Sequence, residues 1–403
     1  MSTTAELPVF DEEFVADLHA KYREIRAETP VQRMVTPQGL PLWAITRYED
    51  ARNALTDPRL AKDFRRTGEI IDRIDPEGSV RRPFNSALSE QMLNLDPPDH
   101  TRLRKLVVKA FTARRVENLR PRVEQIAADL LDRMSEHDEV DLLDAFAFPL
   151  PIQVICELLG VEEGRRDDFR RWTNALLDAS EPEVTRRAGL AMADYLVELI
   201  AAKRARPADD LLTALIETTE DSDRLSEAEL VSMVFLLLVA GHETTVNLIG
   251  NGVLALLRNP EQWAALKADP DLVAGAVEET LRFDGPVMHG TLRHTTEPVT
   301  VGEVIIPEGE IVWVGLASAN HDPDRYADPE RFDINRDAQG HLAFGHGIHF
   351  CLGAPLARVE GQIALRGLVE RFPDLAPAGE LDDVRWRFST LIHGLKTLPV
   401  RLR

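Results

Sequence analysis

Apolar residues recur at intervals of three and four along most of the 403-residue chain. This spacing places them on one face of an α-helix, so it predicts a mainly helical protein. The predicted helices cover residues 11–28, 101–111, 120–136, 151–159, 165–179, 183–203, 227–257 and 261–268.

Strand-like alternation of apolar and polar residues is confined to three regions. Residues 31–48 predict a hairpin around the turn Pro37-Gln38-Gly39, residues 299–317 predict strands separated by glycine turns, and residues 384–402 predict short strands. We therefore expect an α+β fold class that is mainly α with small β-sheets. No linker or internal repeat divides the sequence, which predicts a single domain over residues 1–403.

Residues 65–93 carry charge, prolines and little periodicity, which predicts a loop with a short helix. Long loops in compact domains are commonly either lids over functional sites or disordered segments. We favour a lid, because Phe84, Leu88, Met92 and Leu93 offer apolar contacts.

The stretch from Val231 to Ala240 is apolar on almost every side, which predicts a buried helix. Polar residues follow in the segment 241–245, and the apolar pattern then resumes at Val246. Buried polar groups need partners, so either the helix reaches solvent here or these side chains serve a buried site. A threonine can also bond a carbonyl of the preceding turn and distort the helix, which opens a groove.

Cys351 follows a glycine-rich turn and directly precedes a predicted helix, whose first turn contains Pro355. At a helix N-terminus, free backbone N–H groups and the positive end of the helix dipole favour a thiolate, which is the form that binds a metal. A single cysteine is nevertheless more often a small buried core residue. Taken alone, Cys351 fits either interpretation, whereas Cys156 lies in an apolar helical pattern and is predicted to pack in the core.

The formal net charge is −21, from 47 basic and 68 acidic residues. This charge argues against nucleic acid or an anionic membrane as a partner, and it is otherwise a common basis of solubility. The N-terminus lacks a signal-peptide pattern, and the apolar stretch 231–241 is shorter than the ~20 residues that span a bilayer. We therefore expect a cytoplasmic protein without a membrane anchor.

Residues 344–353 read Phe-Gly-His-Gly-Ile-His-Phe-Cys-Leu-Gly. This segment resembles the haem-binding loop of the cytochrome P450 family, Phe-Gly-x-Gly-x-His-x-Cys-x-Gly, at every fixed position. The resemblance implies the cytochrome P450 fold, with haem b between a long central helix and the helix after the cysteine loop. It implies an axial thiolate from Cys351, which is the metal ligand. The loop residues expected to bind the cofactor are Phe344, Gly345, His349, Cys351 and Gly353.

The central segment resembles the oxygen-binding groove of the same family, Ala/Gly-Gly-x-Asp/Glu-Thr. On this resemblance Ala240 and Gly241 leave room for dioxygen. Thr244 and Glu243 are the expected catalytic residues, with Thr244 delivering protons to the oxygen and Glu243 relaying them from water.

Further cofactor contacts and a structural network follow from the resemblance. His100, Arg104 and Arg293, together with His349, match the family's partners of the haem propionates. Two buried propionates without cations would be costly, so the chemistry calls for such groups. Glu279 and Arg282 match the Glu-x-x-Arg pair, and Arg331 is expected to complete the network that holds the cysteine loop.

Residues 100–115 form a local inversion of charge in an acidic protein, since they include Arg102, Lys105 and Lys109 and no acid. In the family this helix lies on the cysteine side of the haem, where the electron donor docks. We therefore expect an acidic ferredoxin as donor, supplied by a ferredoxin reductase with NAD(P)H-derived electrons. We also expect the enzyme to act as a monomer.

The expected reaction is insertion of one oxygen atom of dioxygen into a large lipophilic substrate. The chain most resembles soluble bacterial members that hydroxylate polyketide macrolides, steroids and other secondary metabolites. Epoxidation, phenol coupling or C–C cleavage by the same fold are alternatives, and a haem-binding sensor without turnover is a further one. The Glu243-Thr244 pair argues against the sensor.

Candidate substrate contacts follow from their positions relative to these motifs. They are Phe84, Met92, Leu93, Leu236, Val239, Ala240, Val287, Met288, His289, Leu391 and Ile392. His289 stands where family members tend to carry apolar residues, so it either hydrogen-bonds the substrate or packs against its neighbours.

Overall fold

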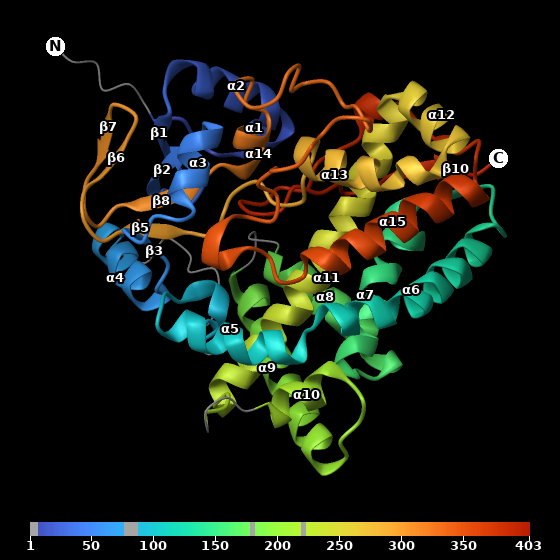
Figure 1. Cartoon of the computed structure of the whole chain (residues 1–403), viewed down its shortest axis with the longest axis horizontal. Helices are drawn as coiled ribbons and strands as arrows, with labels where there is room; N and C mark the ends of the chain where they lie inside the picture. The colour runs from blue at the N-terminus through green and yellow to red at the C-terminus, as the bar shows by residue number, and fades with distance from the viewer. Residues whose placement is uncertain (1–6, 76–87, 178–181, 219–222) are drawn as a thin grey trace.

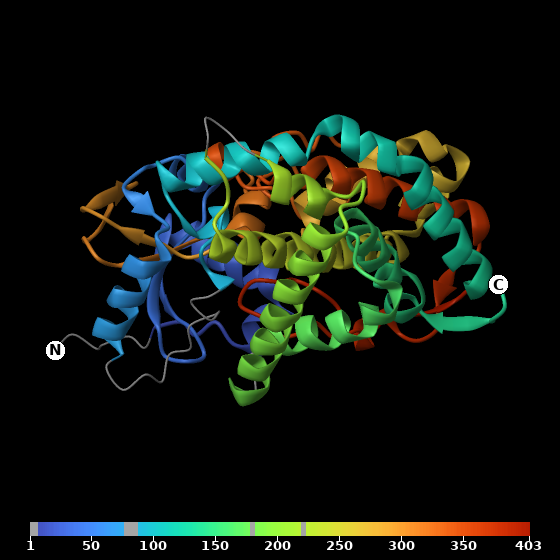
Figure 2. The ribbon, with the colours of Figure 1, turned by 90° about the horizontal axis from the view of Figure 1, so that it is seen from below.

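The computed structural model of the protein describes residues 7–75, 88–177, 182–218 and 223–403. Its five-stranded and two-stranded sheets lie at one end of the long axis, and the long helices fill the remainder (Figure 1). The view turned by 90° shows the same division (Figure 2). The fold class is mainly α with small β-sheets, as the sequence predicts.

Helices account for most of the ordered elements. They are α1 (Glu12–Ala16), α2 (Leu18–Glu28), α3 (Tyr48–Ala54), α4 (Phe64–Ile74), α5 (Asp99–Ala110), α6 (Ala113–Met134), α7 (Pro149–Leu159), α8 (Arg166–Leu177), α9 (Pro182–Ala205), α10 (Leu211–Glu217), α11 (Glu227–Arg258), α12 (Pro260–Ala268), α13 (Val273–Phe283), α14 (Leu316–Asn320) and α15 (Ala354–Arg371).

The strands form three sheets. They are β1 (Val31–Val35), β2 (Pro41–Ile45), β3 (Leu60–Ala61), β4 (Glu139–Asp141), β5 (Arg293–Thr295), β6 (Val299–Val301), β7 (Val304–Ile306), β8 (Ile311–Val314), β9 (Ala376–Pro377) and β10 (Pro399–Arg401). The sheet orders are β1-β2-β8-β5-β3, β4-β10-β9 and β6-β7. The predicted hairpin at 31–48 is confirmed, since β1 and β2 pair antiparallel with Val31 opposite Ile45.

Helix α11 passes through the middle of the helical region (Figure 1). It begins at a capping box, in which the Ser226 hydroxyl accepts from the Glu229 N–H and the Glu229 carboxylate accepts from the Ser226 N–H. By length and composition α11 could also cross a bilayer, but 67% of its most apolar window is buried inside the protein. Such burial is typical of the core helix of a globular fold, so α11 is the central packing surface for its neighbours.

Several predicted elements differ from the structure. Of the short strands expected over residues 384–402, only β10 forms. The helix expected over residues 11–28 is split into α1 and α2 at Asp17, whose backbone leaves the helical region. The loop expected from residue 65 begins instead with the 11-residue helix α4, which buries Ile70 and Ile71 and exposes its charged residues. The many charged residues in this segment made the narrow apolar face of α4 hard to recognise from the sequence. The middle of the expected lid, residues 76–87 with Phe84, lies outside the described residues.

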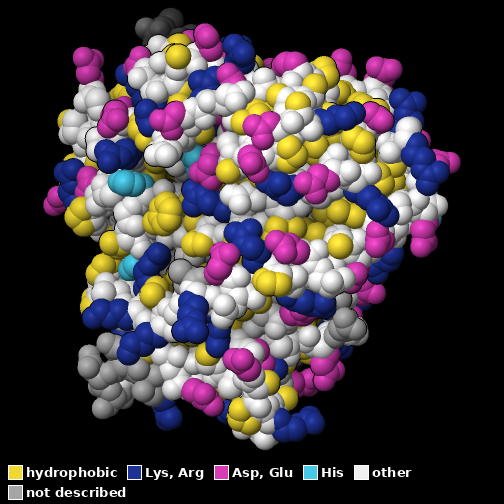
Figure 3. Space-filling view, turned by 45° about the vertical axis from the view of Figure 1, so that its right-hand side comes forward, with side chains coloured by type: hydrophobic (Ala, Val, Ile, Leu, Met, Phe, Trp, Pro, Cys, Tyr) yellow, Lys and Arg dark blue, Asp and Glu magenta, His cyan; other side chains and the backbone are white. Residues whose placement is uncertain are grey.

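The net charge is not concentrated on the face shown in Figure 3. Side chains of both signs are interspersed there, with hydrophobic side chains between them (Figure 3). Many charged side chains also form ion pairs at the surface, and such exposed pairs contribute little to stability.

A buried ion network joins α13 to the segment before the cysteine loop. The Arg282 guanidinium donates two hydrogen bonds to the Glu279 carboxylate, both 2.8 Å long, and both side chains are fully buried. Arg282 also donates to the backbone oxygens of Asn320 and Pro329, at 3.0 and 2.9 Å. The network therefore fixes the backbone that leads into the cysteine loop.

The third member of this network is Arg336, and the expectation of Arg331 was wrong. The Arg336 Nε donates to Glu279 at 3.2 Å, while the Arg331 side chain is 66% exposed and faces Asp333 at 3.7 Å. Arg331 contributes only its backbone oxygen, which accepts from Arg282 and Arg336. The two arginines lie five residues apart in an irregular segment, where sequence spacing does not reveal which side chain turns inward.

We predict that Arg336→Ala destabilises the protein by about 1.5–3 kcal/mol, because a hydrogen bond to a buried carboxylate is lost. Arg331→Ala should change the free energy of unfolding by less than about 0.5 kcal/mol, as is usual for exposed side chains. Denaturant unfolding of the two variants measures the difference. Equal effects would contradict this assignment of the network.

Candidate functional site

The cysteine loop is shaped by two glycines and closed by a backbone hydrogen bond. Gly345 and Gly347 have φ angles of 70° and 74°, in the left-handed region that favours glycine. The N–H of Cys351 then donates to the carbonyl of Phe344 at 2.9 Å. The loop thus delivers Cys351 to the N-terminal end of α15, as the sequence predicts.

The Cys351 side chain is solvent-accessible, although many protein atoms surround its sulfur. Burial raises the pKa of the thiol, while the backbone N–H groups of Gly353 and Ala354 and the nearby guanidinium groups of Arg104 and Arg358 lower it. The net direction is upward, because burial outweighs the helix N-terminus, whose N–H groups favour the thiolate as expected. A thiolate here calls for a metal cation at the sulfur, because coordination deprotonates a thiol outright.

Two arginines brace the loop from outside. Arg358 on α15 donates to both carboxylate oxygens of Glu278, at 2.6 and 2.9 Å, and its guanidinium lies 4.7 Å from the ring centre of Phe344. Arg104 on α5 donates to the backbone oxygen of Phe350 at 2.6 Å. The cysteine loop is therefore held by α5, α13 and α15 together.

Helix α11 keeps accessible surface at one place in its otherwise buried middle. Ala240 is exposed and Thr244 is partly exposed, whereas nearly all residues from 245 to 256 are buried. The Thr244 hydroxyl donates to the carbonyl of Ala240 at 2.7 Å, and the Thr245 hydroxyl donates to that of Gly241 at 3.3 Å. These bonds to the preceding turn are those predicted for threonine, and the helix continues without interruption through them.

Gly241 has a different role from the one expected. A Cβ built on Gly241 would lie 3.0 Å from Cδ1 of Ile155 on α7. The missing side chain therefore lets α11 and α7 approach each other closely, and it does not only leave room for dioxygen. Of the two small residues in the motif, Ala240 is exposed and Gly241 is partly accessible.

Glu243 is buried and does not face water. Its carboxylate accepts a short hydrogen bond from the Arg387 guanidinium, and its other oxygen lies 3.7 Å from Nε2 of the buried His242. Arg387 belongs to the C-terminal segment, so sequence distance concealed this pair. In this structure Glu243 is an ion-paired residue, and direct relay of protons from water would require the pair to separate.

Basic side chains cluster near the cysteine loop. The rings of His100 and His349 lie 4.3 Å apart, centre to centre. Within the described part of the chain, neither nitrogen of His100 nor Nε2 of His349 has a hydrogen-bond partner. Burial and the neighbouring cations lower the pKa of His100 to about 4 and that of His349 to about 2. Burial also lowers the pKa of Arg293 to about 10, and Arg293 donates to the backbone oxygens of Leu60 and Leu55.

Lys62 belongs to the same cluster, and our sequence reasoning missed it. It is only 5% exposed, it follows β3 beside Arg293 on β5, and it acts electrostatically on His100, His349 and Arg293. Burial lowers the pKa of Lys62 well below its usual range. The nearby carboxylate of Asp96 is already held by the backbone N–H groups of Lys62 and Asp63. Nothing in the sequence marks Lys62 as a cofactor residue, because a single lysine directly after a short strand resembles an ordinary surface residue.

These features fit a haem. The cluster combines unpaired buried imidazoles with more positive than negative groups, which suits a dianion such as two propionates. The loop supplies an accessible sulfur, and α11 supplies accessible apolar surface at Ala240. His100, Arg104, Arg293, His349 and Lys62 would hold the propionates, and Cys351 would hold the iron.

The predicted substrate contacts divide into two groups. Leu93, Leu236, Val239, Val287 and Leu391 keep partly accessible side chains, whereas Met92 and Ile392 are buried at 7% and 3% exposure. Met288 and His289 are fully buried, and Met288 belongs to the core cluster beside the five-stranded sheet, so neither side chain offers accessible surface to a substrate in this structure. Phe84 lies outside the described residues.

His289 packs, and the substrate-bonding alternative is not supported. Its Nε2 forms a short hydrogen bond with the hydroxyl of Tyr22, and Nδ1 lies 3.1 Å from the carbonyl of Thr390. Its ring stacks on Trp313 with centres 4.3 Å apart. Both nitrogens are thus occupied within the core, which explains a histidine at a position that is usually apolar.

Comparison with known proteins identifies relatives over the whole chain. A family model for cytochrome P450 matches residues 152–385. The chain is similar to Cytochrome P450 107B1 of Saccharopolyspora erythraea, with 63% identity over 402 residues and 99% of each chain covered. It is 44% identical over 410 residues to the 6-deoxyerythronolide B hydroxylase of the same species, with 100% of each covered. The solved structure of the tirandamycin C-bound P450 monooxygenase TamI matches with a TM-score of 0.92 and 51% identity, covering 98% of this chain and 100% of that one.

We predict opposite effects of Lys62→Met on the loaded and unloaded protein. A buried cation without a strong partner is costly, so the variant without haem should unfold at higher denaturant concentration than the parent. Loss of a cation beside the propionates should speed haem transfer to apomyoglobin about tenfold, equivalent to about 1.4 kcal/mol. The exposed Lys396→Met is the matched control and should change neither quantity. Unchanged haem transfer in Lys62→Met would remove Lys62 from the cofactor site.

Proposed function

The chain belongs to the cytochrome P450 family, and from this premise we propose that it hydroxylates a large lipophilic secondary metabolite of the polyketide macrolide or steroid-like class with electrons from a ferredoxin. As a member of this family it is a monooxygenase that carries haem with an axial cysteine thiolate. We assign the thiolate to Cys351. When bound, the haem supplies oxygen activation, and thiolate ligation favours O–O cleavage.

The observation that carries oxygenase function is Thr244, a hydroxyl at the accessible place in an otherwise buried helix. A hydroxyl both donates and accepts, so Thr244 can pass on a proton while its bond to the Ala240 carbonyl exchanges. Glu243 can contribute only after its carboxylate leaves Arg387. Proton delivery through Glu243 is therefore coupled to movement of the C-terminal segment.

The substrate class rests on the accessible apolar residues and on the relatives. Leu236, Val239, Val287 and Leu391 are partly accessible aliphatic side chains on three separate segments. They suit a large apolar ligand, because such sites are mostly apolar with few polar groups. TamI, at 51% identity, is described with bound tirandamycin C, and a relative at 44% identity is a 6-deoxyerythronolide B hydroxylase. Substrate-induced spin-state shifts across a compound library, followed by product analysis, would test the class and separate hydroxylation from epoxidation or coupling.

The electron donor is proposed to dock on α5 and the adjoining cysteine loop. Lys105 and Arg114 are exposed, as are the apolar side chains of Val108, Ile348 and Phe350. Arg104 joins the two elements through its bond to the Phe350 oxygen, and Val108 lies one turn further along α5. A basic rim around exposed apolar residues suits an acidic protein partner.

Arg102 is not available for this docking surface. It donates to Asp223 at 3.2 Å and forms a short bond with Glu229, which also caps α11. Replacing it would disturb the fold, so it does not report cleanly on docking.

A cytoplasmic location and a monomeric state complete the proposal. A reducing compartment suits a metal-binding cysteine that is not paired in a disulfide. Electrons from an NAD(P)H-fed ferredoxin are also available there.

We predict that Thr244→Ala keeps haem and substrate binding but diverts reducing equivalents to hydrogen peroxide, because a proton donor is lost. The ratio of product to NAD(P)H consumed should fall severalfold. Thr245→Ala is the matched control, since Thr245 is buried and bonds the preceding turn in the same way. Full coupling in Thr244→Ala would exclude the proposed role, and absence of substrate-dependent NAD(P)H consumption in the parent would favour a sensor.

We predict that the double variant Lys105→Glu and Arg114→Glu is reduced by an acidic ferredoxin at least about tenfold more slowly at low salt. The difference should shrink at high ionic strength, because screening weakens steering between exposed charges. Lys396→Glu, at an exposed position, is the control for a change of charge. Stopped-flow reduction with unchanged rates in the double variant would place the donor elsewhere.

A further inference from the structure

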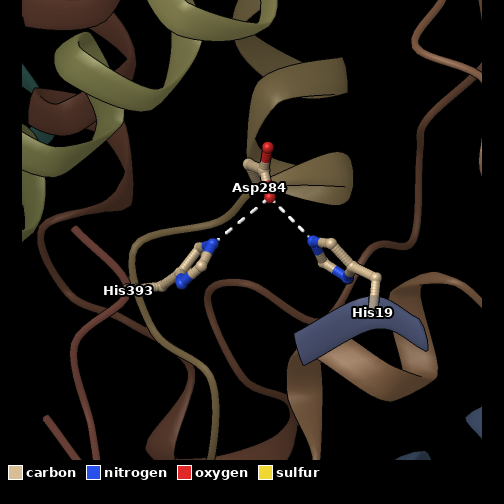
Figure 4. Close-up of side chains that lie close together, drawn as sticks. All are labelled: His19, Asp284 and His393. Carbon is tan, nitrogen blue, oxygen red and sulfur yellow. Dashed lines mark hydrogen bonds and ion pairs between the residues drawn. The ribbon is translucent and has the colours of Figure 1, made fainter. Parts of the chain in front are cut away.

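Three titratable side chains from distant parts of the chain converge outside the haem site. His19 lies in α2, Asp284 directly follows α13, and His393 lies near the C-terminus; all three point toward one another (Figure 4). Nε2 of His19 lies 2.7 Å from Oδ1 of Asp284, and Nε2 of His393 lies 3.3 Å from the same oxygen. One ligand atom from each side chain lies within 4.8 Å of the other two.

The carboxylate of Asp284 is buried, at 5% exposure, between the imidazoles of His19 and His393. A buried carboxylate needs a cation or hydrogen-bond donors beside it.

Several nitrogens of the cluster are unpaired. In the described ranges of the chain, Nδ1 of His19 and both nitrogens of His393 lack a hydrogen-bond partner, although His393 is only 2% exposed. Nε2 of His393 is close to Asp284 without the alignment of a hydrogen bond. Such groups are uncommon in protein interiors, and a bound ion is one of the usual reasons for them.

The surrounding structure holds the cluster in place. The amide nitrogen of Asn251 on α11 donates to the backbone oxygens of both Asp284 and His393, each at 2.9 Å. Trp386 stacks on the His393 ring with centres 3.7 Å apart, and His321 stacks on the His19 ring at 4.0 Å. Rigid, braced side chains are what a preorganised metal site requires.

We propose that His19, Asp284 and His393 bind a divalent cation of the zinc class through Nε2, a carboxylate oxygen and Nε2. Zinc takes histidine and aspartate ligands at about 2.0–2.2 Å in tetrahedral geometry, which sets ligand atoms roughly 3.3 Å apart. The two nitrogen–oxygen separations are 2.7 and 3.3 Å, and all three ligand atoms lie within 4.8 Å of one another. The His19 side chain is 22% exposed, whereas those of Asp284 and His393 are 7% and 3% exposed, so the cluster comes nearest to solvent at His19.

Such an ion would join α2, the end of α13 and the C-terminal segment. It would stabilise the native state alone, because these ligands are distant in the unfolded chain. It would be separate from the haem iron and independent of the proposed oxygenase function.

The experiment uses holoenzyme dialysed against a chelator and then titrated with ZnCl₂ by calorimetry. We expect one tight site per chain and a thermal unfolding midpoint that rises with zinc concentration. His19→Gln and Asp284→Asn should each weaken zinc binding at least about a hundredfold, since a direct ligand is lost. His137→Gln, at an exposed position outside the cluster, should bind zinc as the parent does.

The competing explanation is a plain ion pair in which His19 is protonated and Asp284 needs no metal. In that case the parent shows no tight zinc binding and its unfolding midpoint does not respond to zinc. That result would overturn the proposal, as would tight binding that persists in His19→Gln, a change at a partly exposed position that should not prevent folding.

Discussion

The position of the Cys351 sulfur is the constraint on which the rest of the structure depends. Burial raises the pKa of this thiol, so the protein does not provide a thiolate by itself. It fixes the position of the sulfur instead. The glycine turn, the backbone hydrogen bond from Cys351 to Phe344 and the hydrogen bonds of Arg104 and Arg358 hold the loop in place. The Glu279–Arg282–Arg336 network extends this bracing to the segment that precedes the loop. Much of the buried charge in the molecule therefore serves to place one atom.

The interior near the cysteine loop is locally basic, although the net charge of the chain is −21. The interior near the cysteine loop gathers Lys62, Arg293 and two histidines, with Asp96 as a nearby carboxylate that backbone N–H groups already occupy. Burial disfavours the charged imidazoles, and the neighbouring cations disfavour them further, which is why the histidine pKa values are low. A dianionic cofactor would offset the positive charges of the cluster. The cluster would hold the cofactor, and the bound cofactor would in turn stabilise this part of the fold. An acidic surface and a cationic interior are thus compatible in one chain.

Local patterns predicted most of the fold and the centre of the site. The apolar run that forms α11, the hairpin at 31–48 and the cysteine loop each depend on neighbouring residues, and all three were predicted. The errors lie where contacts join residues far apart in sequence. Arg336 and not Arg331 bonds Glu279, Lys62 lies in the cofactor cluster, and Arg387 pairs with Glu243. These contacts were missed because the folded backbone, and not the spacing in the sequence, decides which side chains meet. His289 was ambiguous for the same reason, since its partner Tyr22 lies in α2.

The C-terminal segment connects these parts through α11. Arg387 binds Glu243, and Asn251, two turns further along the same helix, holds the backbone oxygen of His393. Leu391, a candidate substrate contact, lies between these two anchors. Because buried ion pairs and amide bonds resist separation, a substrate that displaces Leu391 must strain one anchor or the other. The anchor at Glu243 is an ion pair, whereas the anchor at Asn251 is an amide hydrogen bond. The proposed substrate contact at Leu391 and the proposed proton-relay residue Glu243 are therefore joined through the same short segment.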